Sequence, residues 1–149
     1  VQAMSIEDIR WGRCDIKSVN LLANVLARQR AKEAGVFEAI LVREGTVTEG
    51  SVSNVMVVRN GAVQTAPEGR RILSGVTRAI VLDLARKEGI PVAESFVTRE
   101  ELLAASEVFL TGTTVEVLPV VRIDGHAIGG GSPGPVSQLL SRRFEALVG

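Results

Sequence analysis

The sequence is organised around one stretch, Ile9-Arg10-Trp11-Gly12-Arg13-Cys14-Asp15-Ile16-Lys17-Ser18-Val19-Asn20. The chain has fourteen arginines but only three lysines, and the other two lysines lie in segments typical of solvated helices. Lys17 instead follows Ile16 and precedes an apolar run that begins at Val19, so we expect it where the chain enters the core. Partial desolvation of its ammonium would make the amine available as a nucleophile. Alternatively, its aliphatic stem packs and its charged head reaches water, as in most lysines.

The composition around this stretch is that of one globular domain. The 149 residues are 46% hydrophobic and 23% charged, and the formal net charge is zero, which argues against a nucleic-acid partner. No apolar run is long enough for a membrane helix and no signal peptide is visible, so a cytoplasmic location is expected. Cys14 has no partner for an internal disulfide, and we interpret it as a small buried residue rather than a reactive thiol. No cluster of metal ligands occurs.

Hydrophobic periodicity predicts strands alternating with helices, an α/β arrangement. The first helix should lie between a cap at Asn20 and a stop at Gly35, with an apolar stripe assigned to the core. This stripe consists of Leu21, Leu22, Val25 and Leu26. Strands are expected at 37–42, 54–59, 62–65, 92–96, 107–111 and 115–123, the last interrupted by Pro119, and further helices at 75–88, 98–105 and 136–148. Residues 1–9 read as a linker, whereas Asn60-Gly61 and Asp124-Gly125 signal tight turns.

Three other stretches offer chemistry beyond the lysine. Glu49 precedes Gly50 between two pairs of strands, so we expect its carboxylate at a strand end or bulge. Gly75-Val76-Thr77 opens a helix, whose free N–H groups and positive dipole end suit a phosphate. Ordinary helix capping by Ser74 or Thr77 would explain the same residues. Gly112-Thr113-Thr114 offers further donors, although such residues are also common in turns.

Four segments, taken in order, carry a family resemblance. They are Arg13 to Ala27, Val47-Thr48-Glu49-Gly50-Ser51-Val52-Ser53-Asn54, Ile72-Leu73-Ser74-Gly75-Val76-Thr77-Arg78 and Thr111-Gly112-Thr113-Thr114-Val115-Glu116-Val117-Leu118-Pro119-Val120. Together they resemble the fold-type IV pyridoxal phosphate (PLP) enzymes, most of all the D-amino acid aminotransferase branch. The resemblance implies the large C-terminal domain of these enzymes, a barrel-like mixed sheet with surrounding helices. Residues 1–149 would be this single PLP-binding domain, and a smaller N-terminal domain would be absent.

The same resemblance implies roles for eight residues. Lys17 would form the internal aldimine and act as nucleophile and general acid/base in turn. Glu49 would pair with the pyridine nitrogen and Leu73 would pack on one face of the ring. Gly75, Val76, Thr77 and Thr113 would hold the phosphate, and Ser53, with Ser51, would tune the surroundings of the ring. Arg13 could bind phosphate or form a structural ion pair, and Val52 replaces a serine that is frequent in the family.

The activity implied is transamination between a D-amino acid, such as D-alanine, and a 2-oxo acid, by a homodimer. Branched-chain aminotransferase and aminodeoxychorismate lyase are alternatives within the family. An alternative of another class is a catalytically inactive fragment that acts only as a folded assembly module. An apolar face that contacts the absent domain and a partner subunit would then be exposed.

Overall fold

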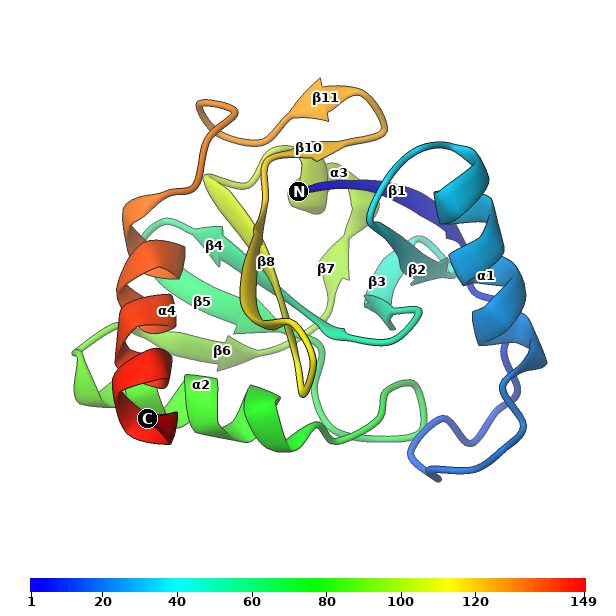
Figure 1. The fold of residues 1–149 in the computed structure, drawn as a ribbon, viewed down its shortest axis with the longest axis horizontal. Coiled ribbons are helices and arrows are strands. Elements are labelled where there is room, and N and C mark those ends of the chain that lie inside the picture. The colour runs from blue at the N-terminus through cyan, green and yellow to red at the C-terminus, as the bar shows by residue number, and fades with distance from the viewer.

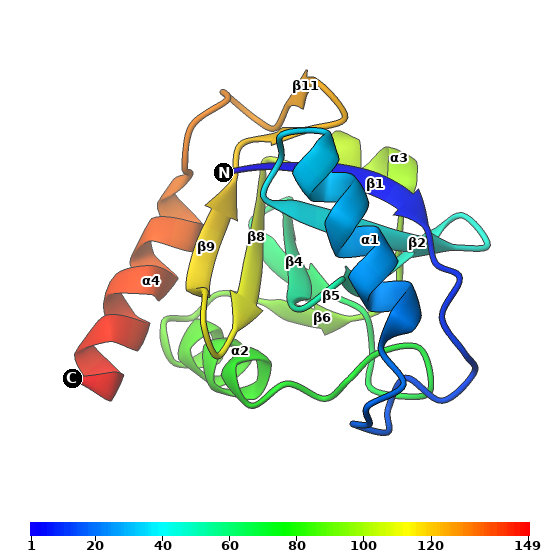
Figure 2. The ribbon, with the colours of Figure 1, turned by 45° about the vertical axis from the view of Figure 1, so that its right-hand side comes forward.

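Two mixed β-sheets form the centre of the molecule, and the three longer helices cover their outer sides (Figures 1 and 2). The computed structural model describes residues 1–149. Its strands are β1 (Gln2–Glu7), β2 (Glu38–Arg43), β3 (Thr46–Gly50), β4 (Asn54–Arg59), β5 (Ala62–Thr65), β6 (Val92–Glu94), β7 (Val97–Thr98), β8 (Glu107–Gly112), β9 (Glu116–Val120), β10 (Arg122–Ile123) and β11 (His126–Ala127). Its helices are α1 (Leu22–Glu33), α2 (Val76–Lys87), α3 (Arg99–Leu103) and α4 (Pro135–Val148). The expected α/β class with a curled, barrel-like mixed sheet is confirmed.

The strand order places the N-terminal strand inside a sheet. The six-stranded sheet has the order β11-β10-β1-β2-β3-β7, and the five-stranded sheet has the order β6-β5-β4-β8-β9. Strand β1 is parallel to both of its neighbours, β2 and β10. The expectation of a linker at residues 1–9 is therefore wrong. The partners of β1 lie far away in the sequence, so no local turn signal announces the strand.

Three apolar clusters hold the layers together. The largest lies between the sheets and includes Ile40, Val57 and Leu110. A second cluster joins the five-stranded sheet to α2 and α4 through residues such as Met56 and Phe109. A small third cluster packs α1 on the six-stranded sheet, and α1 and α4 consequently lie on opposite sides of the molecule in Figure 1. Burial of each apolar face against another layer drives the fold. The clusters therefore set the relative positions of the layers and of the loops that connect them.

Several turns follow the sequence chemistry directly. Glu44-Gly45, Asn60-Gly61 and Asp124-Gly125 all have both residues in the left-handed region, which matches the twist of two-residue hairpins. Thr98 and Glu101 form a capping box at the start of α3. Helix α1 is followed by Gly35 with a φ of +71°, as a helix stop requires.

Helix α1 turns a different face to the sheet from the one expected. Its buried residues are Ala27 and Ala31, and its start carries no side-chain cap, so the cap assigned to Asn20 is wrong. The stripe assigned to the core is exposed: Leu21 49%, Leu22 69%, Val25 58% and Leu26 48%. Periodicity shows which residues share a helix face but not what covers that face. The closely packed side of α1 is instead the one with small alanines.

Smaller differences occur near the C-terminus. Pro119 lies within β9 at the edge of its sheet, where its missing N–H is tolerated, and the predicted strand is interrupted at Val121 instead. Helix α3 ends at Leu103, two residues earlier than expected. Helix α4 buries Leu140 and Phe144, whereas Leu147 near its end is 61% exposed. None of the four helices has the length and apolar character needed to cross a membrane.

Candidate active site

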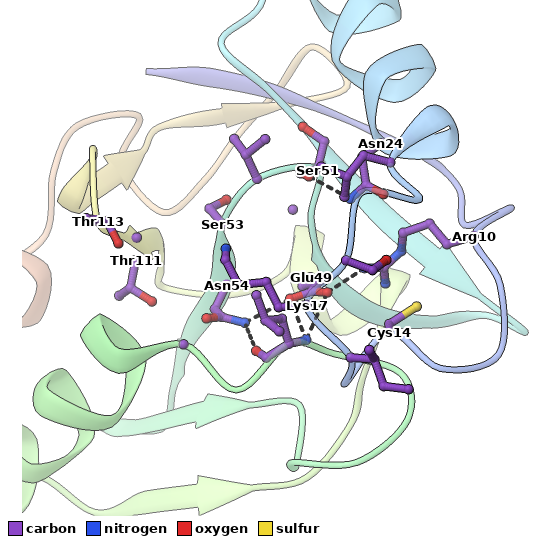
Figure 3. A pocket seen from close by; sticks show the side chains of 18 of the residues that line it. Arg10, Cys14, Lys17, Asn24, Glu49, Ser51, Ser53, Asn54, Thr111 and Thr113 are labelled. Atoms are coloured by element: carbon purple, nitrogen blue, oxygen red, sulfur yellow. Dashed lines mark hydrogen bonds and ion pairs between the residues drawn. The ribbon is translucent and has the colours of Figure 1, made fainter.

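One pocket of about 380 Å³ opens where the loop before α1, the end of β3, the start of α2 and the end of β8 come together (Figure 3). All eight residues assigned to the site from the sequence line it, namely Lys17, Glu49, Ser53, Leu73, Gly75, Val76, Thr77 and Thr113. They come from four separate segments of the chain. In Figure 3, Thr111 and Thr113 lie on one side of the pocket, and Arg10, Cys14 and Asn24 lie on the other. The motifs that are separate in the sequence thus meet at one place in the fold.

Lys17 lies in the loop between β1 and α1 and lines the pocket. Its side chain is exposed, and its neighbour Ile16 is 44% exposed. The expectation that Lys17 enters the core and is partly desolvated is therefore wrong for this chain. The loop follows β1, which ends at Glu7, and it buries Asp8 and Cys14 while leaving Lys17 exposed. Lys17 is positioned at the mouth of the pocket rather than in an apolar interior.

Glu49 is the buried carboxylate of the pocket, 5% exposed, near the end of β3 and close to a register shift between β2 and β3. It accepts hydrogen bonds from Arg10, from Asn54 Nδ2 at 3.0 Å and from the Leu73 backbone N–H at 3.1 Å. The predicted strand-end position is confirmed. Three donors from three segments hold this carboxylate, so its orientation is fixed before any ligand arrives.

Arg10 connects Glu49 to a second buried carboxylate, Asp8. Its guanidinium contacts both carboxylates and also donates to the Arg71 carbonyl at 2.9 Å. Burial raises the pKa of Glu49 to about 7, although Arg10 acts in the opposite direction. Burial would also raise the pKa of Asp8, but the hydrogen bonds and charge of Arg10 outweigh it and lower this pKa to about 2. Of the two carboxylates, only Glu49 titrates near neutral pH.

The first turn of α2 presents backbone N–H groups at the pocket. Its N-cap is Gly75, and no side chain caps the helix. The Ser74 hydroxyl donates instead to Glu68 at 2.6 Å, so the interpretation of these residues as ordinary capping by Ser74 or Thr77 is wrong. Thr111, fully buried at the end of β8, has a hydroxyl with no hydrogen-bond partner in the protein. An uncapped helix start beside an unsatisfied buried hydroxyl favours an anionic ligand.

The turn from Gly50 to Ser53 forms another wall, and buried Glu38 holds it. Glu38 accepts hydrogen bonds from the hydroxyls of Ser51 and Ser53, the latter at 2.9 Å. A Cβ at Gly50 would lie 2.3 Å from Ser53 Oγ and 2.9 Å from Glu38 Oε2. Gly50 is therefore closely approached by these two side chains, and a larger residue would collide with them. Asn24 of α1 donates to the Ser51 carbonyl at 2.8 Å and ties the helix to the same turn.

Two other residues of the opening stretch are now placed. Arg13 is exposed, pairs with Asp15 at 2.8 Å and does not line the pocket, which agrees with the ion-pair alternative. Cys14 is 7% exposed, and burial raises the pKa of its thiol, as expected of a small packed residue. Arg13 therefore lies outside the pocket, and Cys14 lines it as a packed side chain.

Arg10 and Asn54 are functional candidates that the sequence did not single out. Arg10 was not recognised because, apart from Asp8 two positions before it, its partners Glu49 and Arg71 lie about 40 and 60 positions away. Asn54 did give one, because it is a polar residue at the head of the apolar strand β4, in line with buried Met56 and Val58. A polar side chain in such a row needs a buried partner.

The groups around the pocket complement those of PLP. An anionic phosphate suits the start of α2 together with the hydroxyls of Thr111 and Thr113. A protonated pyridine nitrogen suits the Glu49 carboxylate, and an aldehyde suits the Lys17 amine. The pocket volume falls within the range of cofactor sites. The residues present therefore fit this cofactor.

Comparisons with known proteins agree with this geometry. A family model for amino-transferase class IV matches residues 2–123. The D-alanine aminotransferase of Bacillus licheniformis is 52% identical over 93% of the chain, and that of Staphylococcus haemolyticus is 45% identical over 99%. The chain covers 49% and 52% of these two proteins, so it spans about half the length of the relatives it matches.

Solved structures give the same picture. A branched-chain aminotransferase from Thermoproteus uzoniensis with norvaline superposes with a TM-score of 0.89 at 34% identity, over 99% of this chain and 50% of that one. The PLP form of a branched-chain aminotransferase from Thermobaculum terrenum gives 0.90 at 34% identity, over 99% and 50%. The backbone similarity extends over essentially every element described above.

Proposed function

Because this chain belongs to the class IV aminotransferase family, we propose that its protein catalyses PLP-dependent transamination between a D-amino acid, such as D-alanine, and a 2-oxo acid. The observation that carries the proposal is the convergence of all eight predicted residues on one pocket. The choice of D-amino acid is supported by the identity of 52% to a D-alanine aminotransferase, against 34% for the branched-chain enzymes of known structure. Class IV aminotransferases use PLP.

We further propose that residues 1–149 form one cofactor-binding domain of a longer protein, since the matched relatives are about twice as long. A second, smaller domain would supply the opposite wall of the pocket and cover Lys17. This would explain why the side chain of Lys17 is exposed in the present chain. Groups that bind the substrate carboxylate would then come largely from that domain or from a second subunit.

Within the pocket, each residue has a proposed task. Lys17 Nζ would attach the cofactor covalently, and once released would accept the proton from the substrate Cα. PLP, when bound, supplies an electron sink for the resulting negative charge. Glu49 would hold a proton on the ring nitrogen, and Leu73 would contact the ring face. Ser53 would border the ring.

The phosphate would be held by backbone and hydroxyl donors of four residues: Gly75, Val76, Thr77 and Thr113. Three of them begin α2, where the helix dipole favours an anion. The fourth follows β8 across the pocket. This end of the site would anchor the cofactor while groups at the ring react.

The substrate proposal is tested with the full-length protein on two amino donors and one lyase substrate. We expect measurable transamination of D-alanine with a 2-oxo acid and a value of kcat/KM at least about 100-fold lower for L-leucine. Formation of pyruvate from D-alanine reports the first reaction, and release of pyruvate from aminodeoxychorismate tests the lyase alternative. Activity confined to L-leucine would overturn the assignment in favour of a branched-chain enzyme.

We also propose that the protein forms a homodimer through the apolar residues exposed around the pocket mouth and along α1. These are Ile9, Trp11, Ile16, Val19, Leu21, Leu22, Val25, Leu26, Val52 and Val76, each at least 42% exposed. Many exposed apolar side chains near one site are typical of interfaces between subunits. In the alternative of an inactive assembly module, the same face would be the only function of the chain.

Size-exclusion chromatography with light scattering should give at least twice the monomer mass for the purified protein. Val25→Glu should shift it toward monomer, because a buried charge opposes association, whereas this residue, 58% exposed, contributes little to the monomer core. Gln138→Glu, on α4 at the other side of the molecule, adds the same charge and should leave the mass unchanged. A monodisperse monomer of the unsubstituted protein would refute the interface.

A further inference from the structure

Asn54 occupies the point where an apolar row of the five-stranded sheet becomes polar. It shares a face of β4 with Met56 and Val58, which pack against the α2 and α4 layer. Its partner in the adjacent strand is Thr111, just as Met56 pairs with Phe109. The row thus ends in two buried polar side chains where α2 begins (Figure 3).

The amide of Asn54 bridges two parts of the pocket. Its Nδ2 donates to Glu49 Oε2 at 3.0 Å and to the Leu73 carbonyl at 3.0 Å. The Leu73 N–H in turn donates to both oxygens of Glu49, at 3.1 and 3.2 Å. Asn54, Glu49 and Leu73 therefore form a closed ring of hydrogen bonds. Such a ring fixes the loop before α2 relative to the carboxylate.

The other end of the same side chain lies against the N-cap of α2. A Cβ built on Gly75 would lie only 2.2 Å from Asn54 Oδ1. Gly75 has a φ of −75°, which any residue adopts, so the glycine is required for space and not for its backbone conformation. Asn54 and the first turn of α2 are consequently in close contact, and a side chain at Gly75 would force them apart.

We propose that Asn54 is a positioning residue that fixes the start of α2 relative to Glu49, so that a cofactor is held at its phosphate and its ring together. This inference rests on the proposed PLP-dependent function. Asn54 touches neither reacting atom and acts through Glu49, Leu73 and Gly75. Its loss would leave each half of the site present but no longer held at one distance from the other.

The contact with Gly75 is tested first, in protein without cofactor. Gly75→Ala should lower Tm by about 4 °C or more, because its methyl group collides with Asn54. In an Asn54→Ala background the same change should cost less than half as much, since the space is then free. Gly130→Ala, at a glycine with no atom within 4 Å of an added Cβ, is the matched control and should change Tm little in either background. Equal losses from Gly75→Ala in both backgrounds would overturn the contact.

The positioning role is tested by the protonation of Glu49 and by ligand affinity. Asn54→Ala removes a donor to the carboxylate, so carbon-13 NMR of the cofactor-free protein should show Glu49 titrating at a higher pH. The affinity for PLP should fall at least about tenfold, and the preference for PLP over pyridoxal, which lacks the phosphate, should narrow. Asn54→Ser, which keeps one donor, should show the same changes to a smaller degree and serves if the alanine variant folds poorly.

These outcomes separate the two proposals. A purely structural asparagine would lower Tm without moving the Glu49 titration or the ratio of PLP to pyridoxal affinity, and that result would refute positioning. If the unsubstituted protein binds no PLP, the proposed function fails. The Gly75 comparison and the Glu49 titration then still decide whether Asn54 couples the two parts of the pocket.

Discussion

Replacing Lys17 with alanine is expected to abolish covalent capture of PLP and to lower transamination by at least about 1,000-fold. Lys17 is the one lysine that lines the pocket, so no other amine of this chain can take its place there. With added PLP, the unsubstituted protein should develop a visible absorption band, and borohydride reduction should then link the cofactor irreversibly to Lys17. Mass analysis of the peptides identifies the modified residue.

The chain offers matched controls in its other two lysines. Lys32 and Lys87 lie exposed on α1 and α2, so Lys32→Ala and Lys87→Ala should retain both the band and the activity. Reduction that labels Lys32 or Lys87 as readily as Lys17 would mean that PLP reacts with surface amines and not in a built site. Absence of the band from a demonstrably folded protein would favour the alternative of an inactive assembly module.

The parts of the site that the sequence predicted are those encoded in short motifs. Glu49 and Gly50 form a strand end whose close approach only glycine permits, and Gly75 with Val76 and Thr77 begins a helix. Turn and helix-start chemistry acts over a few residues and is therefore visible in the sequence. The resemblance to known enzymes implied in addition that these motifs form one cofactor site.

The parts that could not be predicted depend on contacts between distant segments. Arg10 acquires its role only when β1 and the loop after it bring Asp8 and Arg10 next to Glu49, and β1 itself is defined by parallel partners far away in the sequence. Lys17 follows an apolar residue in sequence but lies exposed at the pocket, whereas Cys14 in the same loop is buried. The apolar stripe of α1 is likewise exposed, although its spacing predicted a place in the core. Burial depends on neighbours across space, and periodicity alone does not identify them.

Glu49 is the residue whose substitution should show most clearly how the buried charges of the site work. Its pKa in the folded protein is about 7, against an ordinary value of 4.5, because burial disfavours the carboxylate. Between these two values the folded state holds a proton that the unfolded state has released. The free energy of unfolding should therefore fall as the pH rises from 4.5 to 7, by up to about 3 kcal/mol.

Glu49→Gln removes this titration while keeping the shape of the side chain. The unfolding free energy of this variant, measured by denaturant titration, should change little between pH 5 and 7. The decrease with rising pH that the unsubstituted protein shows should therefore disappear. Asp8 provides an internal reference. Its pKa of about 2 lies below its ordinary 3.8, so both proteins should lose stability as the pH falls through this range. Glu145→Gln, on the exposed surface of α4, should preserve the slope.

In catalysis, Glu49→Gln should lower the rate of transamination but leave the covalent attachment of PLP intact. A neutral glutamine cannot hold a proton on the ring nitrogen, and we expect kcat to fall by about 100-fold or more. Covalent capture of PLP at Lys17 by borohydride should persist, because neither the lysine nor any residue at the start of α2 is replaced. Steady-state kinetics together with the capture assay thus distinguish the role of Glu49 from that of Lys17. Unchanged kcat in Glu49→Gln would exclude the ring-nitrogen role, and loss of capture together with activity would instead indicate that Glu49 is needed to form the pocket.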